Sequence, residues 1–368
     1  MSEMNPSKSQ AVAIVGAGVF GLSTALELTR RGYTNVTVLD RYLPPAVDGS
    51  SVDISRIIRF DYGDPFYSKM AREAVQAWAA EYPDHYHQVG FVMLNEKGGF
   101  EYTTKTKEVD AKLGKTIEEY ADATQMRLRL PGIPGKLDGL SAYYNPKGGW
   151  ADAESSIAQL ASSCSHAGVS FVTGRRGTVT SLLYHDSKVE GLKVAEGAPI
   201  RASLVILATG AWTEHLLQVG HASSASGQPV GFIQLTDSEA EQLRGMPVMI
   251  NSNKGVFVFP PTPRSNILKV ARHGWGYGTK VRVDDGHAPA RFISCPHRDR
   301  NNARNSYIPE DAQEGLRDGL RDLVPEFAER PWSRLRLCWY SDTPEGDFIV
   351  DKHPQIPGLF IATGGSGQ

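Results

Sequence analysis

The chain has 368 residues, of which 40% are hydrophobic and 22% charged, proportions typical of a globular protein with one large domain or two closely joined domains. A formal net charge of −2 gives no overall attraction to nucleic acid or to an anionic membrane surface, so neither is expected as a partner. The three cysteines, Cys164, Cys295 and Cys338, are far apart and form no CxxC pair, which argues against a disulfide framework and a zinc site and favours a reducing compartment.

The N-terminal segment, residues 1–10, is polar and lacks the apolar centre of a signal peptide. No apolar run in the sequence approaches the roughly 20 residues that are needed to cross a bilayer. We therefore expect an intracellular, soluble protein. Its location is assigned as cytoplasmic or peroxisomal, and its assembly state as a monomer or a weak oligomer. The C-terminal residues do not form a peroxisomal targeting tripeptide.

A βαβ unit is predicted for residues 11–40. The apolar run 12–15 has the length of a buried strand, and apolar residues at helical spacing follow over 20–28. Gly32 stands where a left-handed cap would end that helix, and the β-rich run 36–39 predicts a second strand.

The turn between the first strand and the helix predicts a dinucleotide site. Gly16 allows a tight turn, Gly18 lets a pyrophosphate approach the backbone, and Gly21 lets the helix pack close to the strand. Asp40, about twenty residues further on, can accept hydrogen bonds from the adenosine ribose. This unit alone does not distinguish NAD from FAD.

The next part of the chain alternates helices and strands. Helices are predicted over 65–80 and 104–114, with a strand at 91–94 between them. The segment 148–150 is interpreted as a hinge because it contains two consecutive glycines. Asp152 is expected to cap a helix whose inner face carries apolar side chains.

The middle of the chain indicates a flavin rather than a nicotinamide cofactor. Gly168 ends the helix, 169–172 is a returning strand, and 179–194 is an antiparallel hairpin. The apolar run 203–212 then predicts a buried strand that ends in a glycine turn. An N-terminal βαβ unit combined with a strand ending in Ala-Thr-Gly is typical of flavin-binding folds, so FAD is the preferred cofactor.

The remaining chain predicts a second sheet and a return to the first unit. Residues 228–283 are rich in β-branched and aromatic side chains and predict a mixed sheet. Residues 288–305 are basic and polar and predict a solvated surface loop, with an anion site as the alternative. A helix is predicted over 310–323, followed by strands at 348–350 and 359–361.

These elements predict an α/β (α+β) fold, in which a Rossmann-type FAD-binding domain carries an inserted mixed-sheet substrate domain. The FAD-binding domain is assigned to 1–90, 150–220 and 332–368. The substrate domain is assigned to 91–149 and 221–331.

Three separated motifs resemble the sarcosine oxidase family of flavin-dependent amine oxidases, which includes fructosyl amino acid (amadoriase), saccharopine and pipecolate oxidases. They are the glycine turn 16–21, the segment 49–59 (Gly-Ser-Ser through Arg-Ile-Ile-Arg), and the segments 336–340, 347–354 and 362–367 near the end. The amino-acid sequence of the second motif is closer to that of the saccharopine and pipecolate branch than to that of the amadoriases. The resemblance implies a DAO-type fold.

The resemblance assigns roles to six residues, each with a structural alternative. Cys338 matches a cysteine that forms a thioether with the flavin, although a buried cysteine is commonly a small hydrophobe. Lys269 matches a lysine that promotes reaction of reduced flavin with O₂, the alternative being a lysine that snorkels at a sheet edge. Arg59 matches the arginine that binds the substrate carboxylate.

Arg56 would lie closer to the flavin and tune its electrostatics, and surface ion pairing is the alternative for both arginines. Tyr340 and His273 correspond to positions that face the substrate, although either residue could be structural. The catalytic set is therefore Lys269, Arg59, Tyr340 and His273, and no metal is expected. The cofactor-binding set comprises Gly16, Gly18, Val19, Phe20, Gly21, Asp40, Arg41, Ser50, Ser51, Arg56, Val179, Thr209, Gly210, Trp212, Cys338, Gly364, Gly365, Ser366 and Gly367.

Two departures from the family pattern qualify these assignments. Phe257 stands where sarcosine-specific members carry an active-site tyrosine, so a different and larger substrate is expected. Family members continue with a His-Gly-Phe-Lys-like segment and a C-terminal helix, whereas this sequence stops at Gln368. Because that lysine is the second half of the carboxylate clamp, we expect a truncated product or an impaired activity.

The predicted function is an FAD-dependent oxidase of a secondary amine that gives an imine and hydrogen peroxide, with O₂ as acceptor. The substrate would be an N-substituted or cyclic amino acid such as an N-methyl amino acid, saccharopine, pipecolate or a fructosyl amino acid. One alternative is another oxidoreductase with the same N-terminal fold, a flavin hydroxylase or an NAD-dependent dehydrogenase. The other is a weakly active or inactive remnant of the family.

Overall fold

A six-stranded sheet forms the first half of the molecule. In the computed structural model, which describes residues 7–96, 100–284, 290–296 and 308–365, its strands run in the order β21-β22-β13-β1-β2-β9. All are parallel except β21, which is antiparallel to β22. The bounds are β1 Val12–Val15, β2 Val36–Leu39, β9 Ser170–Val172, β13 Leu204–Leu207, β21 Ile349–Lys352 and β22 Leu359–Thr363.

Alternating side chains of β1 pack against different layers on the two faces of this sheet. Val12 and Ile14 face helices α1 (Val19–Arg30) and α5 (Ala153–His166), where they join Leu22 and Leu160 in one apolar cluster. Val15 faces the other way, toward a small antiparallel sheet of β10 (Val179–His185), β11 (Lys188–Val194) and β12 (Ile200–Arg201). The predicted strand–helix–strand unit and hairpin are confirmed.

Local capping also agrees with the sequence. Gly32 has a φ of 88° just after α1, as expected for a left-handed helix end. The Asp152 side chain accepts the N–H of Ser155 at 3.0 Å and so caps α5.

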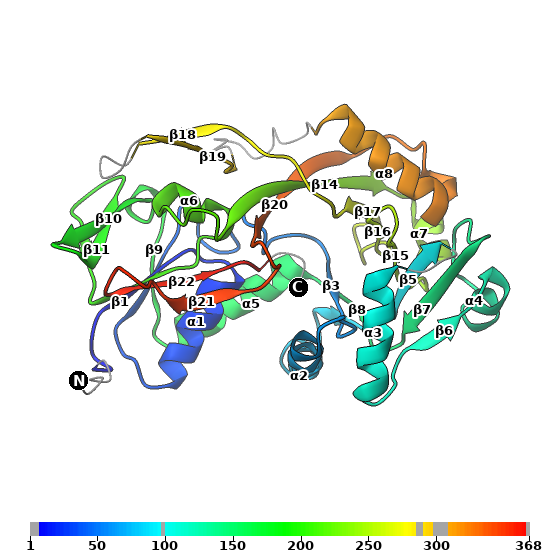
Figure 1. Ribbon diagram of the computed structural model, residues 1–368, viewed down its shortest axis with the longest axis horizontal. Coiled ribbons are helices and arrows are strands. Elements are labelled where there is room, and N and C mark those ends of the chain that lie inside the picture. The colour runs from blue at the N-terminus through cyan, green and yellow to red at the C-terminus, as the bar shows by residue number, and fades with distance from the viewer. Residues whose placement is uncertain (1–6, 97–99, 285–289, 297–307, 366–368) are drawn as a thin grey trace.

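An eight-stranded sheet forms the second half, and β14 and β20 extend from it across the top of the first half (Figure 1). The order is β20-β14-β17-β16-β15-β5-β7-β6. The bounds are β5 Phe91–Glu96, β6 Glu118–Tyr120, β7 Leu140–Asn145, β14 Ser224–Gln234, β15 Val248–Asn251, β16 Val256–Val258, β17 Ile267–Arg272 and β20 Arg334–Asp342.

The helix predicted over 310–323 is present as α8 (Glu310–Leu323), and it covers one face of this sheet with Leu316 and Leu320 fully buried. Gly319 brings the helix close, because a Cβ there would lie 2.2 Å from a methyl group of Val256. The other helices and short strands are α2 Pro65–Glu81, α3 Glu101–Lys112, α4 Ala123–Arg129, α6 Thr213–Leu216, α7 Asp237–Leu243, the 3₁₀ turns Gly174–Arg176, Gly210–Trp212 and Pro325–Phe327, β3 Arg56–Ile58, β4 Tyr86–His87, β8 Gly149–Ala151, β18 Val281–Val283 and β19 Arg291–Ile293.

Two local predictions were wrong. The segment 148–150, predicted as a hinge, overlaps strand β8, which pairs with β3 on one side and β4 on the other. Gly149 lets the neighbouring strand approach closely, because a Cβ there would lie 2.0 Å from the His87 oxygen. The predicted loop 288–305 contains β19, which pairs with β18, while 297–305 lies outside the described residues.

The division into two domains stays a prediction, although residues 334–342, assigned to the FAD-binding domain, are part of the eight-stranded sheet as β20. None of the helices in the described ranges combines the length and the apolar character that crossing a membrane requires.

Candidate active site

A cavity of about 1240 Å³ lies where residues of the two large sheets face each other. Gly21 does not line it but packs helix α1 against the turn, since a Cβ there would lie 1.9 Å from the Gly16 oxygen. Ser366 and Gly367 lie outside the described residues. All the other predicted site residues line the cavity: Gly16, Gly18, Val19, Phe20, Asp40, Arg41, Ser50, Ser51, Arg56, Arg59, Val179, Thr209, Gly210, Trp212, Lys269, His273, Cys338, Tyr340, Gly364 and Gly365.

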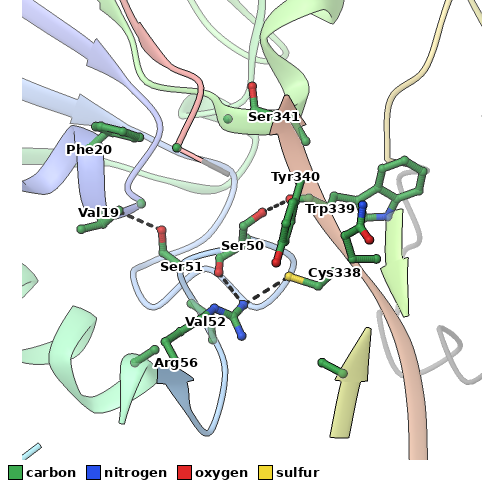
Figure 2. A pocket seen from close by; sticks show the side chains of 18 of the residues that line it. Val19, Phe20, Ser50, Ser51, Val52, Arg56, Cys338, Trp339, Tyr340 and Ser341 are labelled. Carbon is green, nitrogen blue, oxygen red and sulfur yellow. Dashed lines mark hydrogen bonds between the residues drawn. The ribbon is translucent and has the colours of Figure 1, made fainter. Parts of the chain in front are cut away.

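The glycine turn at one end of the cavity suits a phosphate group. Gly18 is the N-cap of α1 and contributes no capping side chain, and the first turn of the helix contains no acidic residue. The positive end of the helix dipole is therefore available to an anion. Ser51 adds a hydroxyl at this point, accepting the N–H of Val19 at 3.0 Å (Figure 2).

Polar and aromatic side chains gather beyond the turn. The carboxylate of Asp40 accepts the N–H of Ala17 at 2.8 Å and so ties the end of β2 to the turn. Arg41 forms an ion pair with Asp48 at 2.8 Å, and its guanidinium lies over the Trp212 ring, 4.3 Å from the centroid. These groups give a flat, polar-edged surface that fits a nucleoside.

A buried ionic cluster forms part of the cavity wall through Lys269 and Arg56. One oxygen of Asp53, Oδ2, contacts Lys269 Nζ at 2.9 Å, a guanidinium nitrogen of Arg56, and Arg336 Nη2 at 3.4 Å. Lys269 is only 1% exposed, and its ammonium also donates to the Ser55 carbonyl at 2.5 Å. A single carboxylate thus faces three cations.

The charges in this cluster shift one another's protonation. Burial alone would raise the pKa of Asp53, but Lys269 and the two arginines hold it well below its usual range. Burial lowers the pKa of Lys269 to about 7, a shift that Asp53 opposes and Arg56 reinforces. The cluster is therefore cationic, and Lys269 is its most readily deprotonated member.

Arg56 connects this cluster to Cys338. Its second guanidinium nitrogen donates to the Ser50 carbonyl at 2.7 Å and to Cys338 Sγ at 3.2 Å, and Figure 2 shows the sulfur and the guanidinium pointing toward each other. Burial would lower the pKa of Arg56, but Cys338 and Asp53 raise it above its usual value. Arg56 therefore links Cys338 on β20 to the Asp53 cluster through direct hydrogen bonds.

A second buried carboxylate supports Arg59. Its guanidinium contacts Asp61, with Nη1 at 3.3 Å from Oδ2, donates to Tyr102 Oη at 2.8 Å, and lies 4.2 Å from the centroid of the Tyr62 ring. Burial would lower the pKa of Arg59, but these neighbours, led by Tyr102, raise it well above its usual value. Arg59 is therefore a fixed, permanently charged group in the cavity wall.

Asp61 is itself fully engaged. Its carboxylate accepts hydrogen bonds from Tyr143 Oη at 2.6 Å and from Asn145 Nδ2 at 2.7 Å, and the residue is 1% exposed. Arg59 and Asp61 follow strand β3 of the three-stranded sheet, and strand β7 of the larger sheet supplies both donors to Asp61.

Two aromatic side chains face each other near Arg59. The His273 and Tyr340 rings have centroids 5.6 Å apart. Burial lowers the pKa of His273 and, together with Cys338, raises the pKa of Tyr340. Both are therefore neutral near pH 7. Phe257 lines the same region of the cavity.

Sequence reasoning missed the two supporting carboxylates. Asp53 and Asp61 each lie within three residues of a predicted arginine, and each could have been noticed as an acidic residue in an otherwise apolar and basic motif. Nothing in the local pattern indicates that Asp53 meets Lys269, which comes from β17.

Comparisons with known proteins agree with this geometry. The family model described as FAD dependent oxidoreductase matches residues 11–368. L-saccharopine oxidase of Schizosaccharomyces pombe is 30% identical over 381 residues, which cover 98% of this chain and 86% of that protein. Monomeric sarcosine oxidase of a Bacillus species is 25% identical, covering 97% of this chain and 88% of that protein.

Among solved structures, fructosyl amine: oxygen oxidoreductase (Amadoriase I) from Aspergillus fumigatus superposes with a TM-score of 0.84 at 29% identity. The match covers 98% of this chain and 83% of that one. The shared architecture therefore extends over both large sheets.

Proposed function

The chain belongs to the family of FAD-dependent oxidoreductases, and from this premise we propose that it oxidises a secondary amine to an imine and reduces O₂ to hydrogen peroxide. The substrate class is an N-substituted or cyclic amino acid. The observation that carries this proposal is a cavity that joins the glycine turn to two separate buried cations, Arg59 and Lys269.

The residues present fit FAD. The N-terminus of α1, which has no acidic residue in its first turn, would hold the pyrophosphate, and Asp40 and the stacked Arg41 and Trp212 would hold the nucleoside. FAD, when bound, supplies two-electron redox chemistry that no amino-acid side chain provides.

Cys338 is proposed to hold the flavin through a thioether. Cys338 Sγ would hold the flavin through a bond to its 8α carbon; because this bond would replace one C–H and one S–H bond, the attachment would be a two-electron oxidation with O₂ as the final acceptor. Arg56 donates a hydrogen bond to Sγ at 3.2 Å and would hold the sulfur in one position for this attachment.

Arg59 is proposed to bind the substrate carboxylate. A guanidinium whose other contacts are fixed by Asp61 and Tyr102 is oriented before the substrate arrives, which lowers the entropy cost of binding. Neutral His273 and Tyr340 can then hydrogen-bond the substrate without adding charge.

Lys269 is proposed to support the reaction with O₂. Negative charge develops on oxygen as the first electron arrives, and a buried ammonium at a fixed position stabilises it without solvent reorganisation. Lys269 can act in this step without touching the amine substrate.

A substrate larger than an N-methyl amino acid fits the site best. Phe257 lines the cavity without a polar group, and the cavity volume of about 1240 Å³ leaves room beyond a dinucleotide. The 30% identity to a protein named L-saccharopine oxidase supports a long N-substituted amino acid. Because its cysteines are buried and form no disulfide, the protein is proposed to act inside the cell. It is further proposed to be a monomer or a weak oligomer.

The first experiment is an absorbance spectrum of the purified chain before and after acid precipitation. We expect flavin bands that stay with the pellet. Bands released to the supernatant would contradict the thioether alone, and Cys338→Ala should release them in any case. A chain that takes up no flavin even with added FAD would contradict the proposed function.

The second experiment measures peroxide with saccharopine, pipecolate, a fructosyl amino acid and sarcosine at equal concentrations. We expect the larger N-substituted amino acids to give the higher kcat/KM. A flavin-loaded protein that forms no peroxide with any secondary amino acid would refute the substrate class.

A further inference from the structure

The carboxylate of Asp53 is shared by groups that reach the cavity and groups that do not. Lys269 and Arg56 line the cavity, whereas Asp53 and Arg336 lie behind its wall. All three cations converge on the same oxygen, Oδ2, while Oδ1 accepts the N–H of Ile54 at 2.8 Å. Asp53 therefore touches no substrate or cofactor itself, yet it contacts both cations that would.

We propose that Asp53 is a positioning residue that fixes Lys269 and Arg56 in one orientation toward the cavity and thereby sets the rate at which O₂ is reduced there. This proposal rests on the proposed function. The step concerned is the transfer of two electrons from reduced FAD to O₂, which takes up two protons and leaves as hydrogen peroxide.

The need for such a residue follows from the flexibility of lysine. Its side chain has four rotatable bonds, and among the residues that the structure describes Nζ of Lys269 contacts two oxygen acceptors, Asp53 and the Ser55 carbonyl. The Phe259 ring, 4.6 Å from Nζ, gives a weaker contact. Without the carboxylate, one neutral acceptor would have to orient the ammonium.

Charge balance gives a second reason. Replacing Asp53 by a neutral residue would leave three buried cations facing one another, and the easiest relief is for Lys269 to lose its proton. The variant Asp53→Asn would thus remove the orientation of the ammonium and also favour its neutral form. Both effects reduce the stabilisation of negative charge on oxygen.

Arg56 provides an independent signature of the same role. It contacts Asp53 through one nitrogen and Cys338 Sγ through the other. A loosened Arg56 should hold the Cys338 sulfur less firmly, so the fraction of acid-stable flavin should fall together with the rate of the oxygen reaction. Asp53 would then link two functions of the site that are otherwise separate.

The test separates the two half-reactions by rapid mixing. Flavin in Asp53→Asn is reduced anaerobically, once with the amine substrate and once with dithionite, and then mixed with oxygenated buffer. We expect reoxidation to slow about 10- to 100-fold, the range typical of residues that orient a direct ligand, and reduction by the amine to change far less. Reoxidation at the native rate would overturn the proposal.

Dithionite keeps this test independent of the proposed function. If no amine reduces the native protein, the proposed function fails, but a slower reoxidation of the dithionite-reduced variant still supports the role of Asp53 in the oxygen reaction. If the amine reduces the protein and reoxidation is unaffected in Asp53→Asn, only the role of Asp53 fails.

A matched control is Asp61→Asn, which also removes a buried carboxylate beside an arginine. Asp53 and Asp61 are 4% and 1% exposed, so each substitution removes one negative charge from a comparably buried position. We expect Asp61→Asn to raise the KM for the amine and to leave reoxidation unchanged. Equal slowing of reoxidation in both variants would overturn the proposal, because it would indicate a general loss of structure.

Two further variants keep the test decisive if Asp53→Asn folds poorly. The double variant Asp53→Asn, Arg336→Met restores the charge balance by removing the cation that lies outside the cavity lining, and it should fold but still reoxidise slowly. In a Lys269→Met background, Asp53→Asn should add little further slowing. A full additional loss would show that Asp53 does not act through Lys269.

Discussion

Single residues of the site gain their properties from buried carboxylates that lie outside the reacting volume. Asp53 holds Lys269 and Arg56, and Asp61 holds Arg59, so each cation is fixed before any ligand arrives. In both cases the cost of burying a charge is offset by a short ion pair and further hydrogen bonds.

Replacing Arg59 by Lys should weaken substrate binding. A lysine cannot form the bidentate pair with a carboxylate, and the loss of one charge-assisted hydrogen bond, about 1.5–3 kcal/mol, corresponds to a rise in KM of about 10- to 100-fold. Steady-state peroxide assays with an amino-acid substrate would measure this. The matched amine without a carboxylate is the control, and an equal rise in its KM would contradict the clamp.

The oxygen reaction should depend on the protonation of Lys269. Burial lowers the pKa of this lysine to about 7, with Arg56 adding to the shift, so its ammonium is charged below that pH and neutral above it. Flavin reoxidation should therefore slow as pH rises through about 7, and Lys269→Met should be slow and independent of pH there. A native rate that stays constant or increases over this range would count against the role of the lysine.

At the scale of elements, the strand–turn–helix unit of β1 and α1 depends on close backbone packing. Gly16 has a φ of 107°, and a Cβ at this position would lie 2.3 Å from the Ala208 oxygen. Gly21 packs against the Gly16 oxygen, so the turn, the helix and β13 are mutually fitted. The N-terminus of the helix can point at a phosphate only while this packing holds.

Replacing Gly21 by Ala should therefore abolish or strongly weaken FAD binding. The new methyl group has no space, and the helix would have to move away from the turn. Gly32→Ala is the control, because that glycine is exposed, has a φ of 88° and meets only the Lys8 side chain. We expect Gly32→Ala to cost about 1–2 kcal/mol of stability and to keep native flavin content by absorbance. Similar flavin loss in both variants would contradict the packing argument.

Much of this element scale can be predicted from the sequence, because periodicity and capping act over a few residues. The bounds of β1, β2 and α8 and the cap at Asp152 follow from such local patterns. Strand β8 was not predicted, since Gly148 and Gly149 at its start suggest a hinge unless the flanking strands are known.

At the scale of the whole molecule, the cavity is lined by both large sheets. Leu39 of β2 and Val179 of β10 contribute from the first half, and Lys269 of β17 and Cys338 of β20 contribute from the second. A ligand that spans the cavity should therefore hold the two halves together. Figure 1 shows how β14 and β20 bridge them in the free chain.

FAD should stabilise the fold more than ADP does. With Cys338→Ala, which makes the cofactor removable, FAD at about 100 times its Kd should add about 2.7 kcal/mol to the free energy of unfolding. The shift in Tm with FAD and with ADP at the same concentration would measure this, since ADP can occupy only the end of the cavity near the glycine turn. Equal stabilisation by both ligands would argue that the flavin makes no contacts with the second half.

The sequence alone determined the βαβ unit, the helix caps, the preference for FAD and the family resemblance, because these depend on residues that are close along the chain or on motifs of fixed spacing. Only the tertiary structure identified Asp53 and Asp61 as supports of the site. Asp53 and Arg336 are 283 positions apart, and Asp61 and Asn145 are 84 apart. The membership of β20 in the larger sheet was likewise decided by its long pairing with β14. Such partners come together only when distant strands pair, and no local pattern of residues encodes which strands will meet.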